Sequence, residues 1–269
     1  MTGHHSRPFL IPTTPHLICA KQGNHTGGAV ALRGDAYTRV EVDGTTWTQN
    51  SVSRSLPIGG DGGALYVVGG TSVNISRSDF YGNQAAGFGG AFSVRRDEGV
   101  VFPVPPSPQV TLYDTSIRGN AADQGGGAYF IATGNLTVNE CVLRDNEAVE
   151  VGGAIRITNQ DPAGVVSLHG SRFESNSVTG AATFGRRRGG AVDLENARAV
   201  RVTSCAFKGN IVTEANRVMS GGGALSIDLF SPNLFPDSEL SISRCIFQEN
   251  QVRCHGILVD LILVASFIT

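Results

Sequence analysis

The chain repeats one short pattern of apolar and polar positions seven times. Each copy ends on an Asn, with a large apolar residue three positions before it, a small residue five before it, and apolar residues eight and ten before it. In one copy these positions hold Val73, Ile75, Ser78, Phe80 and Asn83. Apolar residues two positions apart predict a strand, because alternate side chains of a strand point to the same face.

A Gly-Gly-Ala triplet followed by a second apolar alternation forms the other half of the repeat. The triplets begin at Gly27, Gly62, Gly89, Gly126, Gly152, Gly189 and Gly222. Two glycines permit a tight corner with positive φ, where a Cβ would clash. In the segments 192–194 and 129–131 the outer two residues are expected to face the interior, and no segment keeps a helical period. The pattern predicts about three strands per repeat.

The spacing of the Asn predicts the architecture. Successive Asn lie 26 to 40 residues apart, and a period in this range indicates a solenoid, propeller or array. Short strands with no helix between them favour an all-β, right-handed parallel β-helix of about seven coils, stacked about 4.8 Å apart. An inward Asn in each coil would hydrogen-bond to the Asn above and below it. The expected ladder is Asn50, Asn83, Asn120, Asn146, Asn176, Asn210 and Asn250.

The repeat pattern begins and ends partway through a coil. The repeats cover residues 19–261, after an irregular segment 1–18 that has no clear strand before Cys19, and before an apolar tail 262–269. The segment 259–261 copies 192–194, so the C-terminal end is expected to open a further, truncated coil. We expect a fragment of a longer solenoid without complete caps, which self-associates through its exposed ends.

Phe-x-x-Asn alternating with Gly-Gly-Ala also indicates a family. Strict copies stand at 80–83, 173–176, 207–210 and 247–250. The motif pair resembles the repeat of the polymorphic outer membrane proteins, within the pectin-lyase-like superfamily of right-handed parallel β-helices. The resemblance implies an extracellular or cell-surface β-helix used in adhesion or as a scaffold. It does not extend to a secretion signal at the start or to a C-terminal translocator domain.

Composition and charge narrow the function classes. The 269 residues are 41% hydrophobic, which suffices for one sizeable folded unit. A net charge of −2 without a basic stripe argues against nucleic-acid binding, and residues 257–268 are too short for a transmembrane helix. The basic run 186–188 is expected to be a solvated loop tip. No cofactor or metal motif is present, so we expect neither.

The candidate catalytic residues lie in the outward column six positions before the Asn. Asp114 and Glu140 would stand on neighbouring coils, with Arg77 one coil away, as an acid pair with an oxyanion partner. The alternative is a surface charge cluster. Arg156 and Asp193, outward in the triplet strand, are expected to form a surface ion pair of little energetic value.

Cysteines and sequons give the remaining candidate sites. Cys205 and Cys245 occupy one column on neighbouring coils, either as small buried residues or as a disulfide, since the stacking distance lies within the Cα range of about 4.4–6.8 Å. Asn74 and Asn135 are possible N-glycosylation sites, whereas the sequon at Asn24 would face the interior.

Constant strands joined by connections of variable length are how solenoids build binding faces. We therefore expect a non-catalytic extracellular or cell-surface scaffold, an adhesin-like module that binds a partner protein or a glycan through variable loops. The alternative is a carbohydrate-active β-helix enzyme, either a polysaccharide lyase or a glycoside hydrolase, which would need a carboxylate cluster facing a groove.

Overall fold

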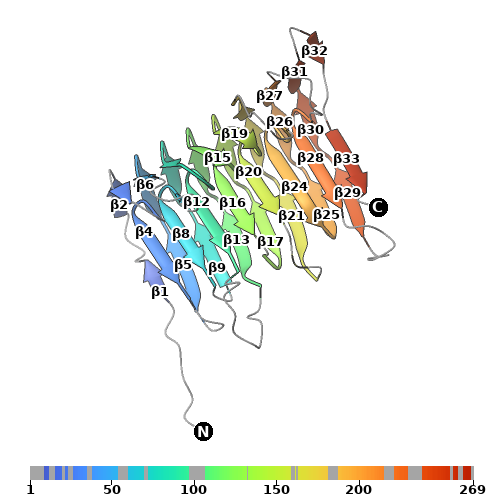
Figure 1. Cartoon of the computed structure of the whole chain (residues 1–269). Coiled ribbons are helices and arrows are strands. Elements are labelled where there is room, and N and C mark those ends of the chain that lie inside the picture. The colour runs from blue at the N-terminus through green and yellow to red at the C-terminus, as the bar shows by residue number, and fades with distance from the viewer. Residues whose placement is uncertain are drawn as a thin grey trace.

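The computed structural model winds the chain into a stack of parallel β-coils (Figure 1). It describes residues 9–11, 16–19, 22–23, 27–34, 38–53, 60–69, 72–96, 107–131, 133–158, 161, 163–180, 187–214, 221–229, 238–254, 257–259 and 263–267. In this described part every regular element is a strand, and no helix is long and apolar enough to cross a membrane.

Four parallel sheets run along the stack, here called A to D, with neighbouring strands of each sheet coming from successive coils. Sheet A contains β1 (Phe9–Ile11), β5 (Arg39–Asp43), β9 (Ser72–Ser76), β13 (Gln109–Tyr113), β17 (Leu136–Asn139), β21 (Val165–His169), β25 (Ala199–Thr203) and β29 (Glu239–Ser243). Sheet B contains β2 (His16–Cys19), β6 (Thr45–Thr48), β10 (Asp79–Tyr81), β14 (Ser116–Arg118), β18 (Val142–Arg144), β22 (Arg172–Glu174), β26 (Ala206–Lys208) and β30 (Ile246–Gln248).

The other two sheets complete each coil. Sheet C contains β3 (Gln22–Gly23), β7 (Ser51–Val52), β11 (Gln84–Ala85), β15 (Ala121–Gln124), β19 (Glu147–Val151), β23 (Ser177–Val178), β27 (Ile211–Glu214), β31 (Gln251–Cys254) and the antiparallel β32 (Ile257–Val259). Sheet D, entered through the glycine triplets, contains β4 (Val30–Arg33), β8 (Leu65–Val68), β12 (Phe92–Arg95), β16 (Ala128–Ile131), β20 (Ile155–Thr158), β24 (Val192–Ala197), β28 (Leu225–Leu229) and β33 (Leu263–Phe267).

A coil therefore has four strands rather than the predicted three. The additional strand is the short one in sheet C, directly after the Asn. It was missed because several of its copies are only two residues long, as in β7 and β11, which is too short to show a period of two.

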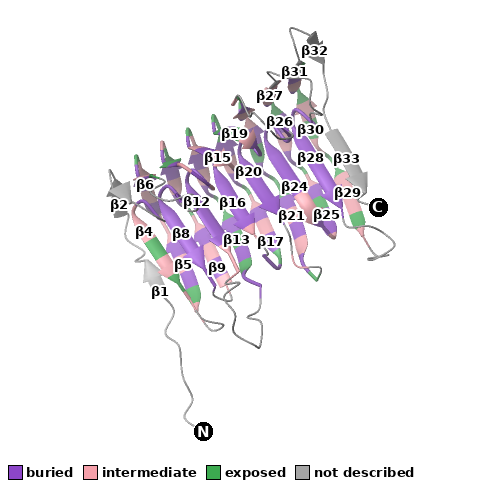
Figure 2. Cartoon of the chain, in the orientation of Figure 1, coloured by how far each residue is buried: buried purple, intermediate pink, exposed green. Residues whose placement is uncertain are grey.

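Buried positions recur on successive strands along the stack (Figure 2). Inside the stack, apolar side chains of one column pack on the same column of the next coil. Trp47 stacks on Phe80 with ring centroids 5.6 Å apart, and Phe173 stacks on Phe207 at 4.7 Å. These four rings are fully buried. Burying each contributes about 1.5–3 kcal/mol, so stability comes from contacts between coils rather than within one.

A continuous column of Asn runs beside the aromatic column. Asn146 illustrates it: its Nδ2 donates to Asn176 Oδ1 at 2.9 Å and to the carbonyl oxygen of Ile117 at 2.8 Å. Its Oδ1 accepts from the backbone nitrogen of Asn120 at 3.1 Å and from Asn120 Nδ2 at 3.0 Å. The side chains that take part are Asn50, Asn83, Asn120, Asn146, Asn176, Asn210 and Asn250, all at most 2% exposed. The column thus satisfies amide groups that are sealed from water.

One triplet is displaced by a residue from its predicted place. Tyr129 pairs with Ser93 and faces outward, whereas Phe130 fills the core at 0% exposure. The corner residue is Gly125, with φ 62°, where an added Cβ would lie 2.3 Å from the carbonyl oxygen of Ala128. Three consecutive glycines left the register ambiguous by one position, so the predicted inward orientation of Tyr129 is wrong.

The two ends also differ from the sequence-based prediction. Strand β1 lies within residues 1–18 and β2 begins there, and the two extend sheets A and B by pairing with β5 and β6. At the other end β33, not residues 259–261, pairs with β28 and takes the opening position of a further coil. The segment 262–269 therefore contains a strand of the solenoid.

Candidate functional site

The three candidate catalytic residues lie on the bend between sheets A and B. Arg77, Asp114 and Glu140 adopt left-handed backbone conformations, with φ of 46°, 46° and 55°, and all three are exposed. Asp114 and Glu140 stand on successive coils, because Tyr113 pairs with Asn139 directly before them. The structure thus brings the acid pair together, but on the open surface of a bend.

The neighbours of these residues engage their charges. Arg77 forms an ion pair with Asp43 of the preceding coil, and the hydrogen bond from Arg77 lowers the pKa of the Asp43 carboxyl. The charge of Glu140 and a hydrogen bond with it raise the pKa of the Tyr113 phenol. Arg77 is therefore paired with Asp43 rather than reserved for a substrate, and the arrangement matches a surface charge cluster.

A buried ionic network lies instead on the outer face of sheet D. Arg156 contacts the carboxylates of Asp193 and Glu195 on the next coil. Arg188 Nε lies 3.2 Å from Asp193 Oδ1, and its guanidinium also contacts Asp228. The Asp193 side chain is 0% exposed and that of Arg156 is 8% exposed. The ion pair predicted between Arg156 and Asp193 does form, but its predicted surface position is wrong.

The network is buried because the segments that enter sheet D cross over its outer face. Isolated parallel bridges join Phe88 to Gln124 and Val151 to Arg188 along this crossing segment. The ring of Phe88 stacks on outward-facing Tyr129 at 4.6 Å. Figure 2 shows that β8, β12, β16, β20, β24 and β28 are mostly buried. Between β8 and β28, sheet D is therefore covered on both faces, unlike sheets A to C.

The basic run follows the same path. Arg187 is 4% exposed and donates from Nη1 to the carbonyl oxygen of Thr213 at 2.6 Å, and Arg188 is 9% exposed. The expectation of a solvated tip is therefore wrong for these two residues, while Arg186 lies outside the described residues. Burial lowers the pKa of the Arg156 guanidinium. Since carboxylates and guanidiniums pair within the network, it joins three coils to one another.

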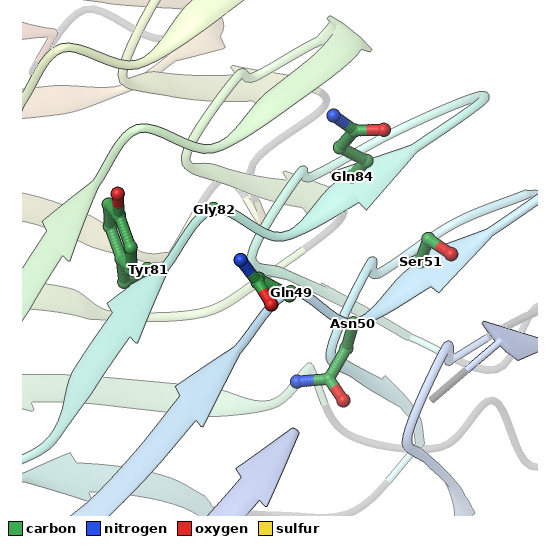
Figure 3. A pocket seen from close by; sticks show the side chains of 6 residues that line it. All are labelled: Gln49, Asn50, Ser51, Tyr81, Gly82 and Gln84. Atoms are coloured by element: carbon green, nitrogen blue, oxygen red, sulfur yellow. The ribbon is translucent and has the colours of Figure 1, made fainter. Parts of the chain in front are cut away.

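A polar hollow that the sequence did not reveal opens at the next bend, between sheets B and C (Figure 3). Its volume is about 310 Å³. The lining residues are Gln49, Asn50, Ser51, Tyr81, Gly82 and Gln84. Two successive coils supply them, so only the fold brings them together.

The comparison with protein families agrees with this geometry. A family model described as a right-handed β-helix region matches residues 21–261. The chain belongs to the right-handed β-helix family. Neither a curated protein nor a solved structure matches it significantly.

Three described cysteines of this right-handed β-helix are free thiols: Cys141, Cys205 and Cys245. Of the two interpretations of Cys205 and Cys245, the possible disulfide is therefore not formed, and Cys205 is a small buried residue. The Cys245 thiol instead donates to the carbonyl oxygen of Ser243 at 3.2 Å. Burial raises the pKa of the Cys141 and Cys205 thiols to about 11, which makes both poor nucleophiles.

The two sequons lie on the outside of the β-helix. Asn74 is partly exposed in the outward row of β9, and Asn135 is exposed before β17. Asn135 Oδ1 accepts a hydrogen bond from the backbone nitrogen of Val165 at 2.9 Å, while Asn24 lies outside the described residues. The described part of the β-helix has no group of three or more His, Cys, Asp or Glu side chains placed to hold a metal ion.

Proposed function

We propose that this right-handed β-helix is a non-catalytic extracellular or cell-surface scaffold, an adhesin-like module that binds a glycan or a partner protein. The observation that carries the proposal is the contrast between its outer faces. From β8 to β28 sheet D is mostly buried and holds the charges of Arg156, Arg188 and Asp193 in ion pairs, whereas sheets A to C carry rows of accessible polar side chains. Accessible rows of this kind suit recognition of an extended partner.

Sheet B offers the clearest such row. Its outward side chains stand in register on successive coils: Tyr81, Arg118, Arg144, Glu174, Lys208 and Gln248. The row is partly or fully exposed along its length, and its aromatic member Tyr81 is 48% exposed. An aromatic ring beside charged and amide groups supplies both stacking and hydrogen bonding.

The predicted variable loops add less than expected to this argument. The longest of them are the connections 95–109 and 228–239, and their central parts, 97–106 and 230–237, lie outside the described residues. The proposal therefore rests on the sheet faces and bends. The Gly-Gly-Ala and Phe-x-x-Asn repeat, which resembles that of polymorphic outer membrane proteins, and the outward positions of Asn74 and Asn135 support a surface location.

Catalysis is the weaker interpretation for a physical reason. A general acid needs an environment that keeps it protonated near neutral pH, and a base needs a substrate-binding groove around it. Asp114 and Glu140 stand exposed on a bend, and the buried Asp193 is already contacted by two arginines. Neither place offers an unpaired carboxylate in an enclosed site.

The test combines binding and turnover on the same ligands. The folded chain is incubated with pectins, alginates, other polyuronides and neutral polysaccharides, and both pull-down and new chain ends are measured. We expect retention on at least one polysaccharide or cell surface without cleavage. Product formation that Asp114→Asn abolishes would establish the carbohydrate-active alternative, and the absence of any retention would refute the adhesin-like role.

A further inference from the structure

The hollow between sheets B and C exists because one bend position carries no side chain. The residue before each ladder Asn adopts a left-handed conformation, with φ of 53° at Gln49 and 64° at Gly82. The next coil again has glycine there, Gly119. A Cβ added at Gly82 would have only Gln49 Cγ within 4 Å, at 3.8 Å. Gly82 therefore leaves open space at a bend position where Asp145, Ser175 and Glu249 of other coils carry a side chain.

One wall of the hollow is an aromatic ring held in place from behind. The guanidinium carbon of Arg118, on the following coil, lies 5.0 Å from the centroid of the Tyr81 ring. Arg118 is fixed by two hydrogen bonds to Asp79, at 2.8 and 3.3 Å. The hollow lies toward the preceding coil, which supplies Gln49 and Ser51. The ring is thus braced by Arg118 on one side, and Tyr81 remains 48% exposed.

The polar lining is not used by the fold. The side chains of Gln49, Ser51 and Gln84 make no hydrogen bond to any residue that the structure describes. Gln49 and Gln84 are exposed, whereas the Asn50 side chain points away from those of Ser51 and Gln84 (Figure 3) and belongs to the buried column. Two amides and one hydroxyl therefore remain free to donate to and accept from a ligand.

We propose that this hollow binds one neutral pyranose ring of a glycan, a site that rests on the proposed glycan-binding function. The C–H face of the sugar would stack on Tyr81, and its hydroxyl groups would hydrogen-bond with Gln49, Ser51 and Gln84. No lining residue is charged, so a uronate or sulfated sugar would gain no ion pair there. A single stacked ring predicts a Kd on the order of 1 mM, with useful avidity only in a multivalent array.

The proposal is tested with the full chain by saturation-transfer NMR against neutral methyl glycosides of glucose, galactose, mannose and N-acetylglucosamine, with methyl glucuronide for comparison. Tyr81→Ala removes the platform, and Gly82→Gln fills the space. Gly82→Gln is conformationally reasonable, because Gln49 holds the same left-handed bend. We expect either change to weaken binding of the preferred neutral glycoside about tenfold or more.

Two matched controls share the chemistry but not the hollow. Gly209→Gln introduces the same side chain at the equivalent bend of a distant coil, where the nearest side-chain atom to an added Cβ is Ser175 Oγ at 3.7 Å. Tyr113→Ala removes another exposed tyrosine, 42% exposed, on the other bend. Both variants should bind as the unmodified chain does, and circular dichroism checks that all four variants fold.

The outcomes separate this site from the wider proposal. Glycoside binding that Tyr81→Ala and Gly82→Gln leave unchanged overturns the hollow as the site, while the glycan-binding role stands. Equal binding of the glucuronide overturns the neutral-sugar assignment. Failure of every glycoside to bind overturns the site outright, and retention on polysaccharides or cells then decides the proposed function independently.

Discussion

Replacing the central ladder residue Asn146 with Leu should destabilise the fold by about 3 kcal/mol. The change removes four hydrogen bonds of 2.8–3.1 Å, two donated by Asn146 Nδ2 and two accepted by its Oδ1. Leu keeps a similar volume, so packing changes little. The main cost is the buried backbone N–H of Asn120, which loses the Oδ1 it donates to and so costs about 1–3 kcal/mol, with smaller losses at the remaining groups.

Urea unfolding followed by circular dichroism measures this effect. With a slope of about 3 kcal/mol/M, the midpoint should fall by about 1 M. The matched control is Asn74→Leu, which makes the same chemical change in an outward, partly exposed position and should alter stability by less than about 0.5 kcal/mol. An unchanged midpoint for Asn146→Leu, or an equal loss for the control, would refute the energetic role of the column.

Three further predictions follow from buried groups. Arg156→Met should lower the free energy of unfolding by about 3 kcal/mol, measured by thermal or urea unfolding, because Asp193 loses a buried partner. The double variant Arg156→Met, Asp193→Leu should recover part of that loss. A larger loss in the double variant would contradict this prediction. Burial raises the pKa of Tyr129 to about 12, so its phenol stays protonated in the folded state while the unfolded state ionises near 10. Stability should therefore fall by about 3 kcal/mol between pH 10 and 12, and Tyr129→Phe should flatten that decline in urea titrations; equal slopes would be evidence against it. Iodoacetamide at pH 8 should modify partly exposed Cys245 before buried Cys141, as mapped by mass spectrometry. A reducing agent should not change the unfolding midpoint. Labelling of Cys141 before Cys245 would disagree with the structure.

Much of the fold could be predicted because the same sequence pattern occurs in every repeat. The positions of Phe80 and Asn83 relative to their strand recur without insertion, so each copy corroborates the others. The spacing of residues within a coil is constant because each coil must pair its strands with those of both neighbouring coils. Register was lost only where this redundancy ended, at the three glycines 125–127 and at the two chain ends.

The outer faces were harder to predict because burial there depends on segments from other parts of the coil. The alternation of inward and outward residues along the strand correctly placed Asp193 on the outer face. An outer position was then taken to mean exposure to solvent. The crossing segment that contains Phe88 and Arg188 covers that face, and the sequence gives no periodic signal for it. The hollow beside Tyr81 was missed for a related reason: it is defined by a side chain that Gly82 lacks, and by Gln49 from another coil.

The Asn column also has a consequence for how such a chain can change its length. From Asn50 to Asn250, each Asn-to-Asn hydrogen bond runs from the Nδ2 of one coil to the Oδ1 of the following coil, so these bonds all point the same way. If the sequence is cut just after one ladder Asn and joined just after another, the two coils that become neighbours therefore still present a matching Asn donor and Asn acceptor. The unit from 121 to 146, the shortest interval at 26 residues, could be duplicated or removed with each new junction repeating a donor–acceptor pair that the molecule already uses. Recombination between coils would then alter the length of the solenoid, and the number of outward rows it displays, without requiring a new interface to be evolved.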